Sequence, residues 1–142
     1  MNKNIPLKIT VLTEYFYPES EKKYDELEVM TNGCLQIKQD GYRLLYRDGG
    51  KENDIFSELT FKKGENSLTV KKKGDVECEM VFSPEKTHTF LYKLSGFSFD
   101  AEILTYALFI DLTEKGGRIE MLYKIVLGGQ EQKISMRIFA EA

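Results

Sequence analysis

Apolar and polar residues alternate with a period of two along most of the chain, which is the pattern of half-buried β-strands. The alternation begins at Leu7, Ile9 and Val11, with polar residues between them. It is clearest from Val76 to Phe82, where two glutamates occupy positions between apolar residues. No window shows the 3.6-residue period of a helix of about ten residues or more. The sequence therefore predicts an all-β protein with little or no helix.

Turn signals rich in Gly, Asp, Asn and Pro separate these runs at intervals of roughly 8–15 residues, which is typical of an all-β sandwich or barrel. Short connections favour antiparallel neighbours in meander order. A barrel also removes the exposed strand edges that promote aggregation. We expect about ten strands, over residues 7–15, 27–37, 42–46, 55–61, 68–70, 76–82, 88–94, 97–112, 119–127 and 134–140.

The run from Phe97 to Leu112 carries apolar residues on both of its faces. We place the even-numbered positions from Leu104 to Leu112 inside the barrel. This leaves an outer stripe that includes Ile103, Ala107 and Phe109. An apolar outer stripe is typical of a contact with another layer or another chain. We therefore expect homodimerisation through this stripe, since two-fold dimers are the commonest oligomers.

Composition narrows the classes of protein that remain. The 142 residues are 42% hydrophobic and 30% charged, which fits a single folded domain over residues 1–142. The net charge of −3 gives no reason to expect a nucleic-acid partner. One His and two Cys argue against a zinc site or a disulfide scaffold. We expect no metal and no cofactor.

The ends and the apolar runs bear on location. The N-terminus lacks the apolar core of about 7–15 residues that a signal peptide needs. The longest apolar stretch, Tyr106 to Ile110, is far short of a membrane span. We expect a cytoplasmic protein without a membrane partner, in which Cys34 and Cys78 are reduced, half-buried core residues.

A family resemblance rests on the order of several segments. They are Gly33, Tyr42 and Tyr46-Arg47-Asp48, then Lys72–Phe82, Tyr92–Gly96, Thr105 and Gly117–Tyr123. This order resembles the YwiB-like family of uncharacterised bacterial β-barrels, which is grouped with the calycins, the lipocalin-like superfamily. The resemblance spans roughly residues 5–140 and implies a single closed antiparallel barrel of eight to ten strands. It implies no activity, and the chain has no Trp for the Gly-x-Trp step of lipocalins proper.

Tyrosines on the apolar phase of their strands are the main candidate binding residues. They are Tyr42, Tyr46, Tyr92, Tyr106 and Tyr123. Inside a small barrel, their rings pack while their hydroxyls need hydrogen-bond partners. We expect Tyr46, Tyr92 and Tyr123 to line a pocket around a small apolar ligand. The alternative is a filled core that uses tyrosine for its volume, because a barrel of about eight strands is only just wide enough for side chains.

The single histidine, His88, shares a strand face with Phe90 and Tyr92. If this face points inward, His88 lies near the barrel mouth and supplies a polar contact to a ligand. The alternative is a rim histidine bonded to a turn. No nucleophile, base and orienting group share a motif, so we expect no catalytic residues and no enzyme activity.

The basic run Lys71-Lys72-Lys73 is interpreted as a solvated hairpin, since acidic residues nearby offset its charge.

The sequence leaves two hypotheses about function. The leading hypothesis is a cytoplasmic barrel that binds a small apolar ligand in its interior. The other is a filled barrel that acts as a protein-interaction or homodimerisation module. An interior cavity of a few hundred Å³ separates the two.

Overall fold

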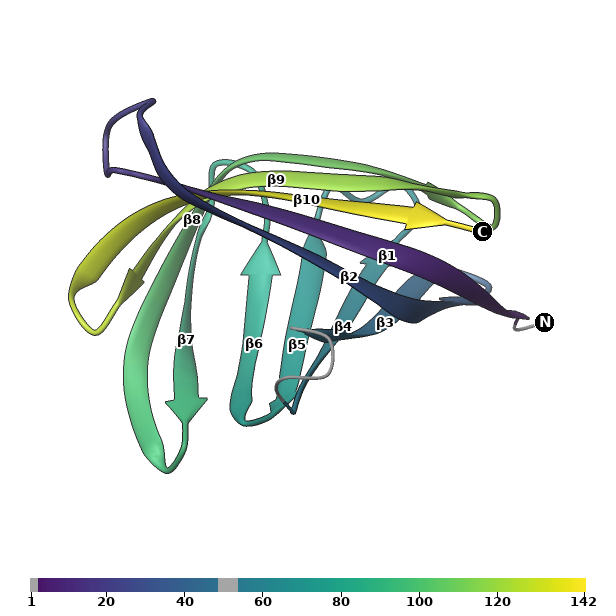
Figure 1. The fold of residues 1–142 in the computed structure, drawn as a ribbon, viewed down its shortest axis with the longest axis horizontal. Coiled ribbons are helices and arrows are strands. Elements are labelled where there is room, and N and C mark those ends of the chain that lie inside the picture. Colours follow the sequence, from purple (N-terminus) through teal and green to yellow (C-terminus); the bar gives the residue numbers. More distant parts are fainter. Residues whose placement is uncertain (1–2, 49–53) are drawn as a thin grey trace.

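Ten antiparallel strands form one closed barrel in the computed structural model, which describes residues 3–48 and 54–142 (Figure 1). Each strand pairs with its neighbour in sequence, and β10 closes the barrel against β1. The strands are β1 (Lys3–Phe16), β2 (Lys23–Ile37), β3 (Gly41–Asp48), β4 (Ile55–Lys62), β5 (Leu68–Gly74), β6 (Val76–Phe82), β7 (Thr87–Leu94), β8 (Phe97–Thr113), β9 (Gly116–Leu127) and β10 (Gln130–Glu141). The predicted all-β meander barrel is confirmed. The described residues include no helix that could span a membrane.

The meander gives the barrel two different ends, because successive strands run in opposite directions. Turns 17–22, 95–96 and 128–129 lie at one end, which we call the hairpin end. The hairpins β1–β2, β7–β8 and β9–β10 project there, away from both chain termini (Figure 1). The opposite end, which holds both termini and turns 38–40 and 83–86, is called the terminal end.

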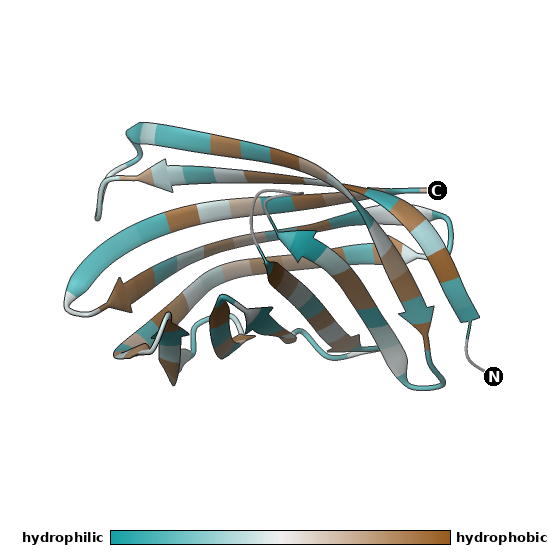
Figure 2. Ribbon diagram, turned by 60° about the horizontal axis from the view of Figure 1, so that its bottom comes forward, coloured by the Kyte–Doolittle hydropathy of each residue, from teal (hydrophilic) through white to brown (hydrophobic). Residues whose placement is uncertain are grey.

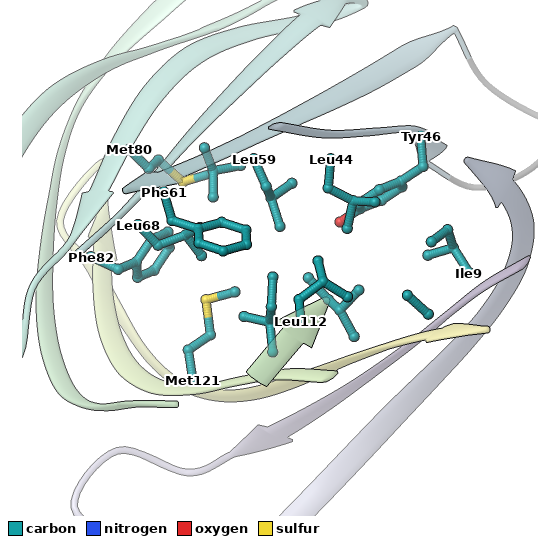
Figure 3. Close-up of a cluster of buried hydrophobic side chains, with 14 of the residues drawn as sticks. Ile9, Leu44, Tyr46, Leu59, Phe61, Leu68, Met80, Phe82, Leu112 and Met121 are labelled. Carbon is teal, nitrogen blue, oxygen red and sulfur yellow. The ribbon is translucent and has the colours of Figure 1, made fainter. Parts of the chain in front are cut away.

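Apolar side chains fill the terminal half of the barrel. Bands of hydrophobic and hydrophilic residues alternate along the strands (Figure 2), so one face of each strand supplies the core. Figure 3 shows these side chains converging from opposite walls. Burying each such side chain stabilises the fold by about 1.5–3 kcal/mol. Fully buried members include Leu35, Leu44, Leu59, Leu68, Phe82, Ile119 and Ile138.

A β-bulge at Tyr106 corrects the predicted orientation of β8. Thr105 pairs with Tyr123 of β9, but the next paired residue of β8 is Ala107, so Tyr106 has no partner in the ladder. The inward face therefore switches from odd to even positions across the bulge. Ile103 is buried, with 0% of its surface exposed, and Tyr106 is 45% exposed. The predictions of Ile103 outside and Tyr106 inside were both wrong.

The rest of the predicted outer stripe does lie outside. Ala107 and Phe109 are exposed, and the guanidinium of Arg118 lies over the Phe109 ring, 5.0 Å from its centroid. The predicted stripe is thus reduced to Ala107 and Phe109, with Tyr106 added by the bulge. The alternation could not reveal this switch, because both faces of β8 carry apolar residues.

Strands β6 and β7 are joined over a short length only. In the described ladder, Val76 pairs with Leu94 and Glu77 with Lys93, and pairing stops there. Toward the terminal end, the turn that links β6 to β7 bonds to β8 instead of β6. The amide of Glu85 in this turn donates to the carbonyl of Thr105 over 2.8 Å. We call the interval between Cys78–Phe82 and Thr87–Tyr92 the β6–β7 seam.

Candidate ligand-binding cavity

The hairpin half of the barrel contains a cavity of about 600 Å³ that is partly open to solvent. This volume falls within the range of roughly 300–1,000 Å³ that is usual for small-molecule sites. The cavity lies between the packed terminal half and the hairpin end, since its lining residues come mainly from the strand segments nearest the hairpin end. Side chains therefore fill one half of the barrel, and the other half contains open space.

One wall of the cavity is largely apolar and comes from β1, β2, β9 and β10. Its side chains include Val11, Val29, Ile125, Ile134 and Met136. These residues lie on the inward phase of four neighbouring strands, which pair in the order β2, β1, β10, β9. The wall therefore offers an apolar surface to a ligand.

The facing wall, from β3 to β7, carries a polar network. The ammonium of Lys72 on β5 forms an ion pair with Asp48 at the end of β3. Lys72 Nζ also donates to Ser57 Oγ over 2.9 Å, and Ser57 Oγ donates to Asp48 Oδ1 over 2.6 Å. Ser57 on β4 is 1% exposed, while the Lys72 and Asp48 side chains are 20% and 22% exposed. The three groups hold one another in place.

The inward position of Lys72 corrects the interpretation of the basic run as a solvated hairpin. Leu68 and Val70 are buried and Lys72 is half-buried, so the three share the inward phase of β5. Lys71 and Lys73, on either side of Lys72 in sequence, are exposed. The alternation from Leu68 could have revealed this, but the run of three lysines obscured it.

Tyrosines form the floor and part of the polar wall. Tyr46 and Tyr123 are buried and line the cavity. Burial raises the pKa of both phenols well above the ordinary value, and the Asp48 charge raises the pKa of Tyr46 further. Burial also raises the pKa values of Tyr92 and Tyr15, which are half-buried at the rim. All four hydroxyls therefore keep their protons near neutral pH and can donate hydrogen bonds.

The structure brings three of the four predicted binding residues together. Tyr46, Tyr92 and Tyr123 all line the cavity. His88 does share a face of β7 with Phe90 and Tyr92, but it lies at the terminal end of that strand, away from the hairpin end. Its ring stacks on Phe90 with 6.0 Å between centroids, and it is not among the residues that line the cavity.

Sequence reasoning missed the polar network. Asp48 follows two residues after Tyr46 on the same inward phase of β3, so its position could have been inferred from the alternation. Ser57 lies on the inward phase of β4 with Leu59 and Phe61. Its pairing with Lys72 depends on the register of β4 against β5, where the two residues are direct partners.

The protein is a β-barrel with an interior cavity that has one apolar wall and one hydrogen-bonding wall. The chain belongs to a family described as "Domain of unknown function (DUF1934)", whose sequence model matches residues 9–138. Its fold is similar to that in the crystal structure of ywiB protein from Bacillus subtilis, with a TM-score of 0.84 and 20% sequence identity. That alignment covers 98% of this chain and 92% of the other. The predicted YwiB-like family is confirmed, and no curated protein sequence matches this chain.

Proposed function

We propose that this protein is a cytoplasmic, non-enzymatic binding protein that holds a small, largely apolar ligand in the cavity at the hairpin end. The observation that carries the proposal is the contrast between the two halves of one barrel. Protein interiors pack as densely as organic crystals, and unfilled apolar space lowers stability. A chain that packs its terminal half fully but leaves about 600 Å³ open in the other half has room for an occupant.

The lining suits such an occupant. Val11, Val29 and Ile125 offer apolar contact. Tyr46, Tyr92 and Tyr123 add aromatic surface and hydroxyl donors that orient a polar group of the ligand. The thiols of Cys34 and Cys78 are free in the structure, as is usual for cytoplasmic proteins.

Native mass spectrometry of gently purified protein tests the proposal, together with thermal shifts across a panel of lipids and metabolites. We expect either a co-purified mass or a ligand that raises the melting temperature. A protein without any bound mass and without any shift across the panel contradicts the proposal.

A cavity-filling variant supplies the matched control. Ile125→Trp places a large side chain on the inward face of β9, whereas Val126→Trp adds the same side chain on the outward face. Binding should be lost in Ile125→Trp and kept in Val126→Trp. Equal binding by the two variants would place the ligand outside the cavity.

We propose a second candidate function, a homodimerisation module, because large apolar side chains lie outside the barrel on β8. Tyr106 is 45% exposed and Phe109 is 43% exposed. Sedimentation velocity of Phe109→Glu tests this function. A dimer that uses this surface should dissociate, and an unchanged sedimentation coefficient counts against it.

A further inference from the structure

The charged groups of the cavity are already neutralised by partners. The lining contains three charged residues, Asp48, Lys72 and Glu131. Lys72 is paired with Asp48, and Glu131 lies 3.0 Å from Lys124. Counted together with Lys124, which pairs with Glu131 from outside the lining, these charges sum to zero.

The Lys72–Asp48 pair lines the cavity and has hydrogen-bonding positions that its own contacts leave unused. An ammonium has three donors, and Lys72 uses two of them on Asp48 and Ser57. A carboxylate has about four acceptor positions, and Asp48 accepts from Lys72 and Ser57. The pair thus offers one donor and at least one acceptor side by side.

A charged ligand is disfavoured at this position. An anion that binds Lys72 competes with Asp48, and a cation that binds Asp48 competes with Lys72. Separating a partly buried pair leaves one charge without compensation, which is costly in an environment of low polarity. A neutral group that accepts from Lys72 and donates to Asp48 leaves the pair intact.

We propose that the cavity selects an uncharged amphipathic ligand whose polar edge carries a hydrogen-bond acceptor beside a donor, as in a primary amide or a lactam. The acceptor binds Lys72 and the donor binds Asp48, while the apolar part lies against Val11, Val29 and Ile125. This inference rests on the proposed function and names the chemical class of its ligand.

A matched ligand series on the unaltered protein tests the inference. Nile red, a neutral apolar dye, serves as the cavity probe. Decanamide, decanoate and decylamine share one alkyl chain and differ in the charge of the polar group. Decanamide should displace Nile red at a concentration about tenfold or more below that of either charged compound, which corresponds to about 1.4 kcal/mol. Equal or stronger displacement by decanoate or decylamine overturns the inference.

Variants of the Lys72–Asp48 pair test whether this pair determines the preference for an uncharged ligand. Asp48→Asn removes the charge that neutralises Lys72, so decanoate should gain about tenfold in displacing Nile red relative to decanamide. Lys72→Met should have the opposite effect and favour decylamine. Lys71→Met and Asp54→Asn change exposed side chains nearby and should leave the order of the three ligands unchanged. An order that stays the same in Asp48→Asn and Lys72→Met overturns the assigned role of the pair.

The two levels of proposal fail differently. If Ile125→Trp binds Nile red, and every ligand found by mass spectrometry or thermal shift, as well as the unaltered protein does, the cavity is not the binding site and the proposed function fails. If Ile125→Trp abolishes dye binding but the charged ligands displace it as well as decanamide does, only the inference about ligand class fails.

Discussion

Lys72 and Asp48 lie 24 residues apart in sequence and form an ion pair inside the hairpin half of the barrel. Two ladders create the contact, since β4 pairs with β3 on one side and with β5 on the other. Ser57 of β4 lies between the two charges and bonds to both. The pair therefore depends on the register of three strands and not on any local motif.

Loss of one partner of this pair should destabilise the fold. Lys72→Met leaves Asp48 partly buried without its counter-ion, so we expect unfolding free energy to fall by about 1–3 kcal/mol, less than for a fully buried pair. Lys71→Met breaks only an exposed pair with Glu79 and should cost about 0.5 kcal/mol or less. Urea denaturation measures both. Equal losses would mean that Lys72 is no better paired than a surface lysine.

Truncation on β8 should distinguish its two faces. Ile103→Ala removes a fully buried side chain and should cost about 2–4 kcal/mol. Phe109→Ala removes an exposed ring and should cost about 1 kcal/mol or less in the monomer. Thermal or urea unfolding of dilute protein provides the comparison. A larger loss for Phe109→Ala would contradict the placement of the bulge.

High pH should unfold the protein through its buried tyrosines. The pKa values of Tyr46 and Tyr123 are raised in the folded state, so the unfolded chain releases these protons first. Their contribution to stability is complete below the unfolded phenol pKa of about 10 and falls as pH rises above it. Absorbance near 295 nm should show these two phenols ionising only as the protein unfolds.

Phenylalanine variants assign the late titration. Tyr46→Phe and Tyr123→Phe should each remove one late-ionising group from the eight tyrosines of the chain. Tyr17→Phe changes an exposed ring and should leave both late-ionising groups in place. Simultaneous ionisation of all tyrosines below the unfolding transition would contradict the burial of the cavity floor.

The β6–β7 seam should be the least protected part of the barrel wall. Cys78–Phe82 and Thr87–Tyr92 face each other across an interval without ladder pairing. We expect the amides that point into the seam to exchange hydrogen faster than amides of the continuous β1–β2 ladder. Amide exchange followed by NMR resolves the two sets. Equal protection would show that the seam is closed in solution.

Much of the fold could be predicted because burial on one face imposes a period of two on the sequence. Alternation around Val76–Phe82 and the short turns between strands predicted the antiparallel meander. The same logic placed Tyr46 and Tyr123 on the inward phase, where both are buried. These positions follow from the pleat of a single strand, which is a local property.

The remaining features depend on contacts between strands. The bulge at Tyr106 is visible only in the pairing with β9, because either phase of β8 reads as apolar. The position of a residue between the hairpin end and the terminal end also depends on the arrangement of all the strands. His88 and Tyr92 share a face, yet they lie toward opposite ends of β7. Only Tyr92 lines the cavity.

The bulge in β8 determines which residues in the second half of the strand face the core. Leu108, Ile110 and Leu112 face the core because Tyr106 is left out of the pairing with β9. Deletion of Tyr106 alone would remove the bulge yet keep Ile103, Leu108 and Leu112 on one face, because Thr105 and Ala107 already pair with adjacent residues of β9. Deletion of Phe109, which is paired in the ladder, would instead turn either Leu108 or Leu112 toward solvent, so it should destabilise the fold more than deletion of Tyr106 does.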